Sequence, residues 1–429
     1  MLTTDRLTRA DVYRTIAELF SPSPNVDRGA TGPGLVGVEL EWIPSLPAHR
    51  PPAVVGVPKL QSLLGSVPNL VSEARLTFEP GGQLEISPSP SPSVAQLLER
   101  TNNLLTAIRA SLAAGGIELF SSGVNPWHSV EDLGLQTPAP RYISMQAHFD
   151  AIGPAGRAMM RQTAALQVCL DLGGPTKAID RWRLANLAGP ALAAAFANSP
   201  VLAGSATGSP GTRSGIWQRI DASRTGFDGR QFGPTEAGDV AEAYLEFALR
   251  AEFIELPATE GAPSVDPQRR SFASWLDSGA GPIDQRDLAF HLSTLFPPVR
   301  PRRHLEVRYI DAPPGRWLPV PIALLAALLY EPTATREALE LLGDRLPDVS
   351  VWERSASRAM GDSELRATAL DLFRIALDAF PRLARSYMPD HIPALVAEYR
   401  ERFPQSGRCP ADDQLDRIVR DKEDLSTWR

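Results

Sequence analysis

The sequence predicts an α+β protein in which an antiparallel sheet is followed by a helical C-terminal region. Short segments before residue 319 alternate polar and apolar residues, as strands with one buried face do. Beyond Pro319 nearly every segment has apolar residues at three-and-four spacing, which indicates helices. We therefore expect residues 319–429 to form helices that pack on the preceding sheet.

Composition narrows the class of protein. The chain has 429 residues, of which 43% are hydrophobic and 22% charged, close to the average of soluble globular proteins. A formal net charge of -7 argues against a nucleic-acid partner, because binding to phosphates needs a concentrated basic face. The sequence lacks a signal-peptide pattern and a long apolar run, which predicts a cytoplasmic protein without membrane contact.

The two cysteines, Cys169 and Cys409, are too few for a disulfide framework. Cys169 lies in "AALQVCLDLG", which we interpret as part of a helix with a buried thiol. No redox switch is expected from these residues.

The predicted elements divide the chain into an N-terminal helix and loop (1–33), a catalytic domain (34–318) and the C-terminal helical region (319–429). Alternation or terminating prolines and glycines predict the strands, and helical periodicity predicts the helices. The expected strands are 35–44, a hairpin over 68–88, 115–127, 141–150 and 304–311. The expected helices are 5–20, 93–114, 154–172, 177–197, 235–255 and 284–296, with a loop region over 200–233.

Four predicted strands place their polar residues on a common face. In "GVELEW", Glu39 and Glu41 point together while the apolar residues between them point to the other face. Ordinary half-exposed strands also alternate, but these four contain no lysine. The same parity groups Gln83 with Glu85, Gln146 with His148 and Asp150, and His304 with Glu306 and Arg308.

The hairpin "FEPGGQLEIS" carries acids where a buried turn is expected. Parity lets Leu84 and Ile86 face the core while Gln83 and Glu85 face a site. Glu79 precedes the Pro-Gly-Gly turn, so simple alternation does not fix its direction.

Converging carboxylates repel one another unless cations or protons intervene. Magnesium and manganese prefer oxygen ligands and also bind triphosphates, so this pattern favours a metal-nucleotide site over a zinc site. The sequence has neither a GxxxxGK[ST] loop nor a strand-linked GxGxxG, so phosphate contacts are expected from metals and arginines. Arg308 is one candidate, and the loop "GTRSGIWQRIDASRTG" adds Arg213, Arg219 and Arg224, although each loop arginine alone is more often a surface residue.

In this order, "GVELEW", "FEPGGQLEIS", "SMQAHFD" and "HLEVRYID" resemble segments of the plant-type and actinobacterial glutamate-cysteine ligases, including those of ergothioneine synthesis. These enzymes belong to the glutamine synthetase-like carboxylate-amine ligases. The resemblance spans residues 34–320 and includes "AAFANSP" and "SGIWQRIDASRT". It implies a strongly curved antiparallel sheet with a concave active-site face and helices on the convex side.

The resemblance also implies roles for individual residues. Glu41, Glu85 and Arg308 would be catalytic, with Arg308 on the ATP phosphates. The implied magnesium ligands are Glu39, Glu41, Glu79, Glu85, His148 and Glu306. The implied substrate-binding residues are Gln83, Met145, Gln146, Arg213, Trp217 and Arg224.

The implied reaction joins the γ-carboxylate of L-glutamate to the amine of L-cysteine through a γ-glutamyl phosphate, with ATP as co-substrate and two or more Mg²⁺ ions. A ligase for a different amine and a non-catalytic metal-nucleotide binding protein are the alternatives. The exit "ISPSPSPS" departs from the family pattern, which leaves the amino-acid specificity less fixed than the ATP chemistry. The oligomeric state is open, with a monomer favoured.

Overall fold

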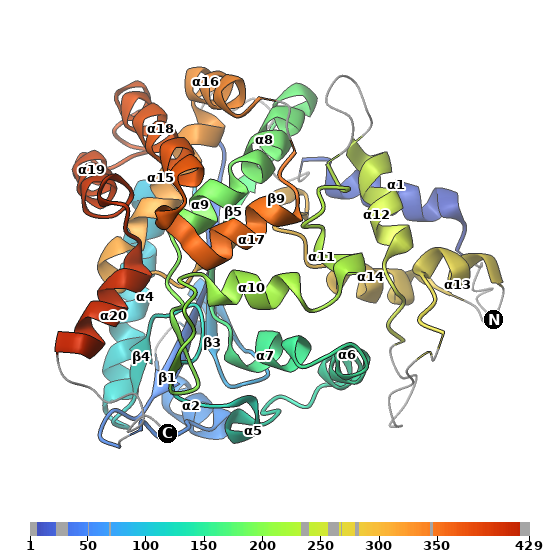
Figure 1. The fold of residues 1–429 in the computed structure, drawn as a ribbon, viewed down its shortest axis with the longest axis horizontal. Coiled ribbons are helices and arrows are strands. Elements are labelled where there is room, and N and C mark those ends of the chain that lie inside the picture. The colour runs from blue at the N-terminus through green and yellow to red at the C-terminus, as the bar shows by residue number, and fades with distance from the viewer. Residues whose placement is uncertain are drawn as a thin grey trace.

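An antiparallel sheet with helices on both sides forms the protein (Figure 1). This confirms the predicted α+β class. The computed structural model describes residues 7–22, 33–49, 51–67, 70–232, 240–255, 266, 268–278, 283–343 and 346–420.

The main sheet has the strand order β2-β3-β1-β5-β9-β8, and β4 pairs with the end of β1. Every neighbouring pair is antiparallel. The strands are β1 (Val36–Ser45), β2 (Ala74–Phe78), β3 (Leu84–Pro88), β4 (Glu118–Phe120), β5 (Ala165–Asp171), β8 (Val299–Pro301) and β9 (His304–Asp311), and a separate ribbon joins β6 (Val201–Leu202) to β7 (Ser205–Ala206).

One face of the sheet is apolar and buried under helices. Leu40, Leu84 and Val307 belong to a single hydrophobic cluster that extends into the C-terminal helices. Figure 1 shows the orange and red C-terminal helices gathered beside α8 and α9. The helices of this side are α4 (Val94–Ala113), α8 (Pro175–Leu187), α9 (Gly189–Ala195), α15 (Pro319–Tyr330), α16 (Pro332–Leu342), α17 (Val349–Arg358), α18 (Ser363–Ala379), α19 (Ile392–Arg402) and α20 (Pro410–Arg420).

Helix α15 explains why the C-terminal region packs so closely. Its sequence "PVPIALLAALLY" is apolar on all sides, and its residues from Val320 to Tyr330 are buried. A helix of this kind needs neighbours all around it. A domain division at residue 319 stays a prediction, because one cluster contains residues from both parts.

Shorter helices complete the fold. The bounds are α1 (Arg9–Leu19), α2 (Val57–Leu64), α3 (Leu70–Glu73), α5 (Val130–Leu133), α6 (Pro140–Asp150), α7 (Ala155–Gln162), α10 (Thr212–Gln218), α11 (Ala222–Thr225), α12 (Val240–Arg250), α13 (Phe272–Ser278) and α14 (Gln285–Ser293). Single 3₁₀ turns span Gly315–Trp317, Ala359–Gly361, Phe380–Arg382 and Pro404–Ser406.

Most predicted elements are confirmed within a few residues. The helix expected over 5–20 begins at Arg9, where Thr8 and Asp11 form a capping box. Parts of the expected segments 1–33, 68–88, 235–255 and 319–429 lie outside the described residues.

Three predictions are wrong. Segment 141–150 is helix α6 and not a strand, because its buried residues follow helical spacing and Pro140 begins the helix. The helix expected over 154–172 ends with α7, and its second half is the central strand β5. The loop region 200–233 contains helices α10 and α11.

Among the described residues, no single helix is long and apolar enough to cross a membrane. Segments 315–330 and 332–342 meet the length and composition criteria only together, and they are bent by 93°.

Candidate active site

Two carboxylates face each other across neighbouring strands. Glu41 of β1 is the register partner of Glu85 of β3, and Glu39 is the partner of Gln167 in β5. The adjacent register pair, Leu40 and Ile86, is buried in the core. The predicted division of these strands into an acidic and an apolar face is therefore confirmed.

The hairpin that carries Glu85 depends on two glycines. A Cβ atom at Gly81 would lie 1.9 Å from the carbonyl oxygen of Arg161, so a side chain does not fit there. Gly82 has a φ of +91°, a conformation that favours glycine. The turn thus packs tightly against α7 and carries the chain from Glu79 into β3.

Gln167 links the acids to the arginine, and the sequence interpretation missed it. Its Nε2 donates to Glu41 at 3.0 Å, and its Oε1 accepts from Arg308 Nη1 at 2.5 Å. Glu41 also accepts a hydrogen bond from the backbone N–H of Ala165 at 2.8 Å. The alternation "LQVCL" could have shown this strand, but its mostly buried residues resemble a helix segment equally well.

Arginines surround Glu306. Arg300 Nη2 lies 2.7 Å from one carboxylate oxygen, Arg302 Nη1 lies 3.1 Å from the other, and Arg308 also pairs with the carboxylate. Burial raises the pKa of Glu306, but Arg300, Arg308 and Arg302 outweigh it and hold this pKa well below its usual range. We call the predicted carboxylates Glu39, Glu41, Glu79, Glu85 and Glu306 the acidic set. Within this set, arginines neutralise the charge of Glu306.

Arginines also lower the pKa values of Glu39, Glu41 and Glu79, but burial and the neighbouring acids outweigh them there. Burial, then Glu306 and Glu85, raise the pKa of Glu39 to about 7, and burial with Glu85 raises the pKa of Glu41 to about 7. Burial, Glu41 and Glu85 raise the pKa of Glu79 to about 8. The effects of Glu41 and Glu85 on Glu79 place this acid, which alternation could not orient, with the others.

This acidic set offers only oxygen donors for a cation. Glu85 accepts from Thr77 Oγ1 at 2.6 Å and from Ser87 Oγ at 3.3 Å, both through Oε1. A divalent cation would offset the burial and the mutual repulsion that together raise the pKa values of Glu39, Glu41 and Glu79. Their oxygen chemistry suits Mg²⁺, although in the described part of the chain the acidic or histidine ligand atoms that lie within 4.8 Å of one another in a group of three are those of His148, Asp221 and Glu252.

Trp217 lies between two arginines beside this face. The guanidinium carbon of Arg213 is 5.6 Å from its ring centre, and that of Arg308 is 5.4 Å away. Arg213 donates to the carbonyl oxygen of Arg308 at 2.9 Å and lies 3.7 Å from Asp311. The structure thus brings Arg213 and Trp217, two of the predicted substrate-binding residues, next to the predicted catalytic Arg308.

Three buried polar atoms of the predicted substrate group have no hydrogen-bond partner in the part of the chain that the structure describes. They are Gln83 Oε1, Arg213 Nε and Trp217 Nε1. Gln83 uses its other end to donate to the carbonyl oxygen of Thr163 at 2.8 Å. Such orphaned groups are expected where a polar substrate binds.

His148 and Arg224 have partners outside the strand acids. His148 Nε2 lies 3.0 Å from Asp221 Oδ2, and Arg224 Nε donates to the same oxygen at 2.8 Å. Arg224 is 0% exposed and also donates to Thr294. His148, Asp221 and Glu252 are spaced closely enough to hold a cation, but the guanidinium of Arg224 already compensates Asp221. The structure therefore joins these two predicted residues in a separate buried network.

Helix α6 contributes differently from the strand that we expected. Met145 packs in a buried apolar cluster with Phe149, and Gln146 hydrogen-bonds to Arg161. Near the start of α6, Arg141 lowers the pKa of Glu79, and burial together with Glu79 raises the pKa of Tyr142 to about 12. Arg141 and Tyr142 are thus neighbours of Glu79. The sequence interpretation did not identify either of these two residues.

An open cavity of about 600 Å³ adjoins one end of the acidic face. Glu39, Gly37 and Cys169 line it from β1 and β5. Arg75 and Arg303 contribute basic groups to the same cavity.

Comparison with known families decides the class of the site. Residues 35–427 match the model of glutamate-cysteine ligase family 2. The chain belongs to this family. The matched region contains all the strands of the main sheet and every predicted site residue.

Curated relatives of this glutamate-cysteine ligase family member agree. The chain is 33% identical over 395 residues to the glutamate-cysteine ligase EgtA of Mycolicibacterium smegmatis, covering 90% of this chain and 88% of that protein. It is 32% identical to EgtA of Mycobacterium tuberculosis, covering 90% and 86%, and 30% identical to the chloroplastic glutamate-cysteine ligase of Arabidopsis thaliana, covering 72% and 60%.

A solved structure supports the fold of the family member. A glutamate-cysteine ligase from Francisella tularensis in complex with AMP superimposes with a TM-score of 0.55 at 12% identity, covering 93% of this chain and 88% of that one. The predicted assignment as a ligase enzyme of the glutamate-cysteine ligase family is confirmed.

Proposed function

We propose that the protein joins the γ-carboxylate of L-glutamate to the amine of L-cysteine at the expense of ATP, by way of a γ-glutamyl phosphate. The observation that carries this proposal is the opposed pair Glu41 and Glu85 with the Gln167–Arg308 bridge beside it. The proposal is supported by the presence, on one sheet face, of acids suited to a cation and a guanidinium suited to phosphate.

Glu39, Glu41, Glu79 and Glu85 are proposed to hold Mg²⁺, and Glu306 orients Arg308. When bound, Mg²⁺ neutralises the ATP phosphates and the charge that develops during phosphoryl transfer. Metal ligation by Glu306 and His148 stays a prediction from resemblance, because both carboxylate oxygens of Glu306 pair with arginines and His148 pairs with Asp221.

ATP is proposed to occupy the cavity of about 600 Å³ next to Glu39, a volume suited to a ligand of this size. Arg308 then contacts the transferring phosphoryl group at the end of this cavity that lies inside the protein. The adjacent exposed Arg75 is placed to contact the outer part of the nucleotide.

In the first step, the γ-carboxylate of glutamate attacks the terminal phosphorus of ATP and ADP leaves. Arg308 and Arg213 offset the repulsion between these anions, because guanidinium groups bind carboxylates and phosphates in matching geometry. The unpartnered Gln83 Oε1 and Trp217 Nε1 are proposed to bind glutamate, with Gln83 accepting from its ammonium group and Trp217 donating to an oxygen.

In the second step, the neutral amine of cysteine attacks the acyl phosphate, and phosphate leaves as the amide forms. Burial of the site protects the acyl phosphate from water. The similarity to EgtA proteins supports a role of the product in ergothioneine synthesis, and we propose a cytoplasmic location for the enzyme.

The test is phosphate release from ATP with glutamate and a panel of amines, each at the same concentration with Mg²⁺. Cysteine should give at least 10-fold more turnover than alanine, 2-aminobutyrate or ammonia. Equal turnover with 2-aminobutyrate would refute cysteine specificity, and ATP binding without turnover for any amine would refute the ligase activity.

A further inference from the structure

The carboxylate of Asp311, at the end of β9, lies beside the buried guanidinium of Arg213. Asp311 Oδ1 is 3.7 Å from Arg213 Nη1, and the two side chains are 4% and 5% exposed. Arg213 also donates to the carbonyl oxygen of Arg308 at 2.9 Å. Because Arg213 lowers the pKa of Glu41, its charge acts on the acidic set. Asp311 is therefore paired with a guanidinium that belongs to the candidate active site.

The other oxygen of Asp311 is held by the segment "ANSP", part of the "AAFANSP" motif. Oδ2 accepts from the backbone N–H of Asn198 at 2.8 Å and from Ser199 Oγ at 2.7 Å. Ser199 Oγ in turn accepts from the backbone N–H of Arg213 at 3.1 Å. The two oxygens of Asp311 thus have separate partners, because the segment fixes Oδ2 and Oδ1 faces the guanidinium.

Asn198 is itself anchored to three other parts of the chain. Its Nδ2 donates to the carbonyl oxygen of Ala312 at 2.8 Å, and its Oδ1 accepts from Gln414 Nε2 of α20 at 2.6 Å. Its carbonyl oxygen accepts from the backbone N–H of Gly123 at 2.8 Å. A fully buried residue whose polar groups are all bonded within the protein holds its neighbours in place.

The space beside the Asp311 carboxylate depends on a glycine. A Cβ atom at Gly123 would lie 2.5 Å from Cγ of Asp311, 2.6 Å from Oδ2 and 2.8 Å from Oδ1. Gly123 does not have a positive φ, so its backbone conformation is open to alanine. The carboxylate is therefore the group that a side chain at Gly123 would displace.

We propose that Asp311 is a positioning residue that directs the guanidinium of Arg213 toward the reacting carboxylate and phosphate, with Asn198 and Ser199 fixing Asp311 for this task. The inference rests on the proposed function through the role assigned to Arg213. A guanidinium that is held in place before the substrate binds stabilises developing charge without a cost of reorganisation. Arg213 Nε, which has no partner within the described part of the chain, stays available to the substrate.

The position of the guanidinium can be measured without substrate, by NMR of protein labelled with ¹⁵N-arginine. The Nε–H resonance that is missing in Arg213→Lys is that of Arg213, and its proton should exchange slowly with water in the wild type. Asp311→Asn should shift this resonance and quicken the exchange at least 10-fold, because the guanidinium loses its charged partner.

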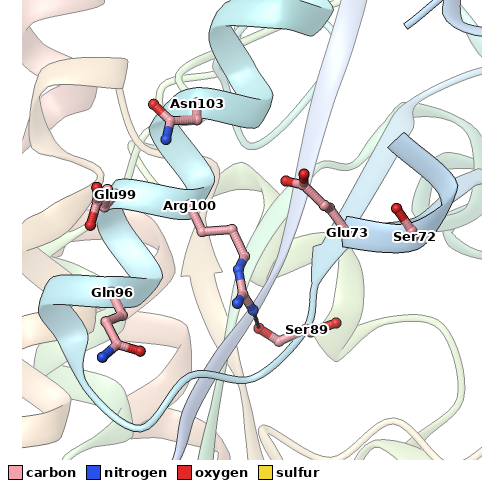
Figure 2. A pocket seen from close by; sticks show the side chains of 7 residues that line it. All are labelled: Ser72, Glu73, Ser89, Gln96, Glu99, Arg100 and Asn103. Atoms are coloured by element: carbon pink, nitrogen blue, oxygen red, sulfur yellow. Dashed lines mark hydrogen bonds between the residues drawn. The ribbon is translucent and has the colours of Figure 1, made fainter. Parts of the chain in front are cut away.

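Arg100 provides the reference resonance, identified by its absence in Arg100→Gln. Arg100 also donates to a backbone carbonyl oxygen, that of Ser89 at 3.1 Å, but it does so in an open groove beside Glu73 (Figure 2). Its exchange should be faster than that of Arg213 and should not change in Asp311→Asn.

Steady-state kinetics test the consequence for the reaction. Asp311→Asn should lower kcat/KM for glutamate at least 10-fold and change the KM for ATP less than 2-fold. In an Arg213→Lys background the same substitution should cost less than 2-fold, because the guanidinium through which Asp311 acts is absent. Gly123→Ala keeps every charge but displaces the carboxylate, so it should also lower kcat/KM for glutamate. Gly123→Ala provides the test if Asp311→Asn does not fold.

Asp362→Asn is the matched control. Asp362, at the start of α18, is also a buried acid that accepts from two backbone N–H groups and from an arginine, Arg354, at 3.0 Å. This variant should leave the Arg213 resonance unchanged and kcat/KM for glutamate within 2-fold of the wild type. Circular dichroism establishes that each variant is folded.

The proposal is overturned if Asp311→Asn leaves the resonance and exchange of Arg213 unchanged, or if its kinetic loss is equally large in the Arg213→Lys background. Absence of ligase turnover in the folded wild type would instead refute the proposed function. The exchange measurement would then still decide whether Asp311 positions Arg213.

Discussion

Glu41 and Glu85 lie directly opposite each other on the antiparallel strands β1 and β3. Like charges at opposed positions destabilise a sheet, so this pair weakens the fold unless a proton or a cation is bound. Their apolar neighbours Leu40 and Ile86 fix the register by burial. Burial of Leu40 and Ile86 therefore keeps Glu41 and Glu85 opposed despite their mutual repulsion.

Replacing Glu85 by glutamine should stabilise the metal-free protein and weaken its Mg²⁺ binding. The loss of one negative charge should raise the thermal midpoint of the metal-free protein, because Glu41 no longer faces an opposing charge. The same change should reduce Mg²⁺ affinity and ligase turnover at least 10-fold. Thermal unfolding with and without Mg²⁺ measures both effects. An undiminished Mg²⁺-induced shift in Glu85→Gln would exclude a metal role for this residue.

The stability of the metal-free protein should fall as pH rises from about 6.5 to 8, above the range in which His128, His148, His291 and His304, whose pKa values burial lowers, act in the opposite sense. The pKa values of Glu39 and Glu41 are raised to about 7 and that of Glu79 to about 8, from a usual value of 4.5. The native state therefore holds more protons than the unfolded chain in this range, and deprotonation costs native stability. Denaturant titrations at fixed ionic strength with a chelator provide the measurement.

Mg²⁺ should reverse this trend, since the ion competes with protons for the same carboxylates. Its stabilising effect should be larger at pH 8 than at pH 6. A metal-free protein that gains stability between about pH 6.5 and 8 would contradict the proton uptake assigned to these acids.

Gln167→Leu should impair catalysis without unfolding the protein. Leucine fills a similar volume but cannot bridge Glu41 and Arg308, so Arg308 loses one of the bonds that orient it. We expect kcat to fall at least 10-fold with a smaller change in the KM for ATP. Leu166→Met, on the apolar face of the same strand, is the matched control and should retain near wild-type turnover. Equal kinetics for the two variants would remove Gln167 from the site.

Arg300 and Arg302 should differ in their effects on stability although both pair with Glu306. The Arg300 side chain is 13% exposed and that of Arg302 is 49% exposed. Arg300→Gln should lower the free energy of unfolding by about 1.5 to 3 kcal/mol, as expected for a buried hydrogen bond to a charged group. Arg302→Gln should cost less than about 1 kcal/mol, because solvent screens its ion pair. If urea titrations gave equal losses in the free energy of unfolding for the two variants, the stronger contribution assigned to the buried Arg300 pair would be wrong.

Asp221→Asn should destabilise the protein but leave Mg²⁺ affinity unchanged. Burial raises the pKa of Asp221, but His148 and Arg224 outweigh it and lower this pKa below its usual value of 3.8. Asp221 therefore contributes stability above that pH, and the contribution is lost as pH falls through its native pKa. Removing one partner from a buried pair costs about 3 to 5 kcal/mol. Calorimetric Mg²⁺ titration distinguishes this structural role from metal ligation, since weaker Mg²⁺ binding would support the predicted metal role of His148 and add Asp221 to it.

Local alternation was enough to find β1, β3 and β9, because each has one polar and one apolar face. It failed for β5, whose central position buries both faces and makes "ALQVCLD" resemble a helix. It also failed for α6, where short polar-apolar alternation conceals helical spacing. Strand parity cannot apply to Gln146 and His148 for this reason.

The site could be predicted only as far as single strands allow. Glu39, Glu41 and Glu85 follow from parity, whereas the bond between Gln167 and Arg308 joins residues 141 positions apart. The pairing of Arg300 with Glu306 depends on the register of β8 against β9. Long-range pairings of this kind leave no local trace in the sequence.

The central claim is that this sheet face phosphorylates the γ-carboxylate of glutamate. The most direct measurement uses glutamate labelled with ¹⁸O in that carboxylate, with ATP, Mg²⁺ and cysteine, followed by mass spectrometry of the released phosphate. One ¹⁸O atom should be transferred to each phosphate, because the carboxylate oxygen that attacked ATP leaves with phosphorus when the amine displaces phosphate from the acyl phosphate. Unlabelled phosphate accompanying full amide formation would contradict the acyl-phosphate route and the role assigned to this face.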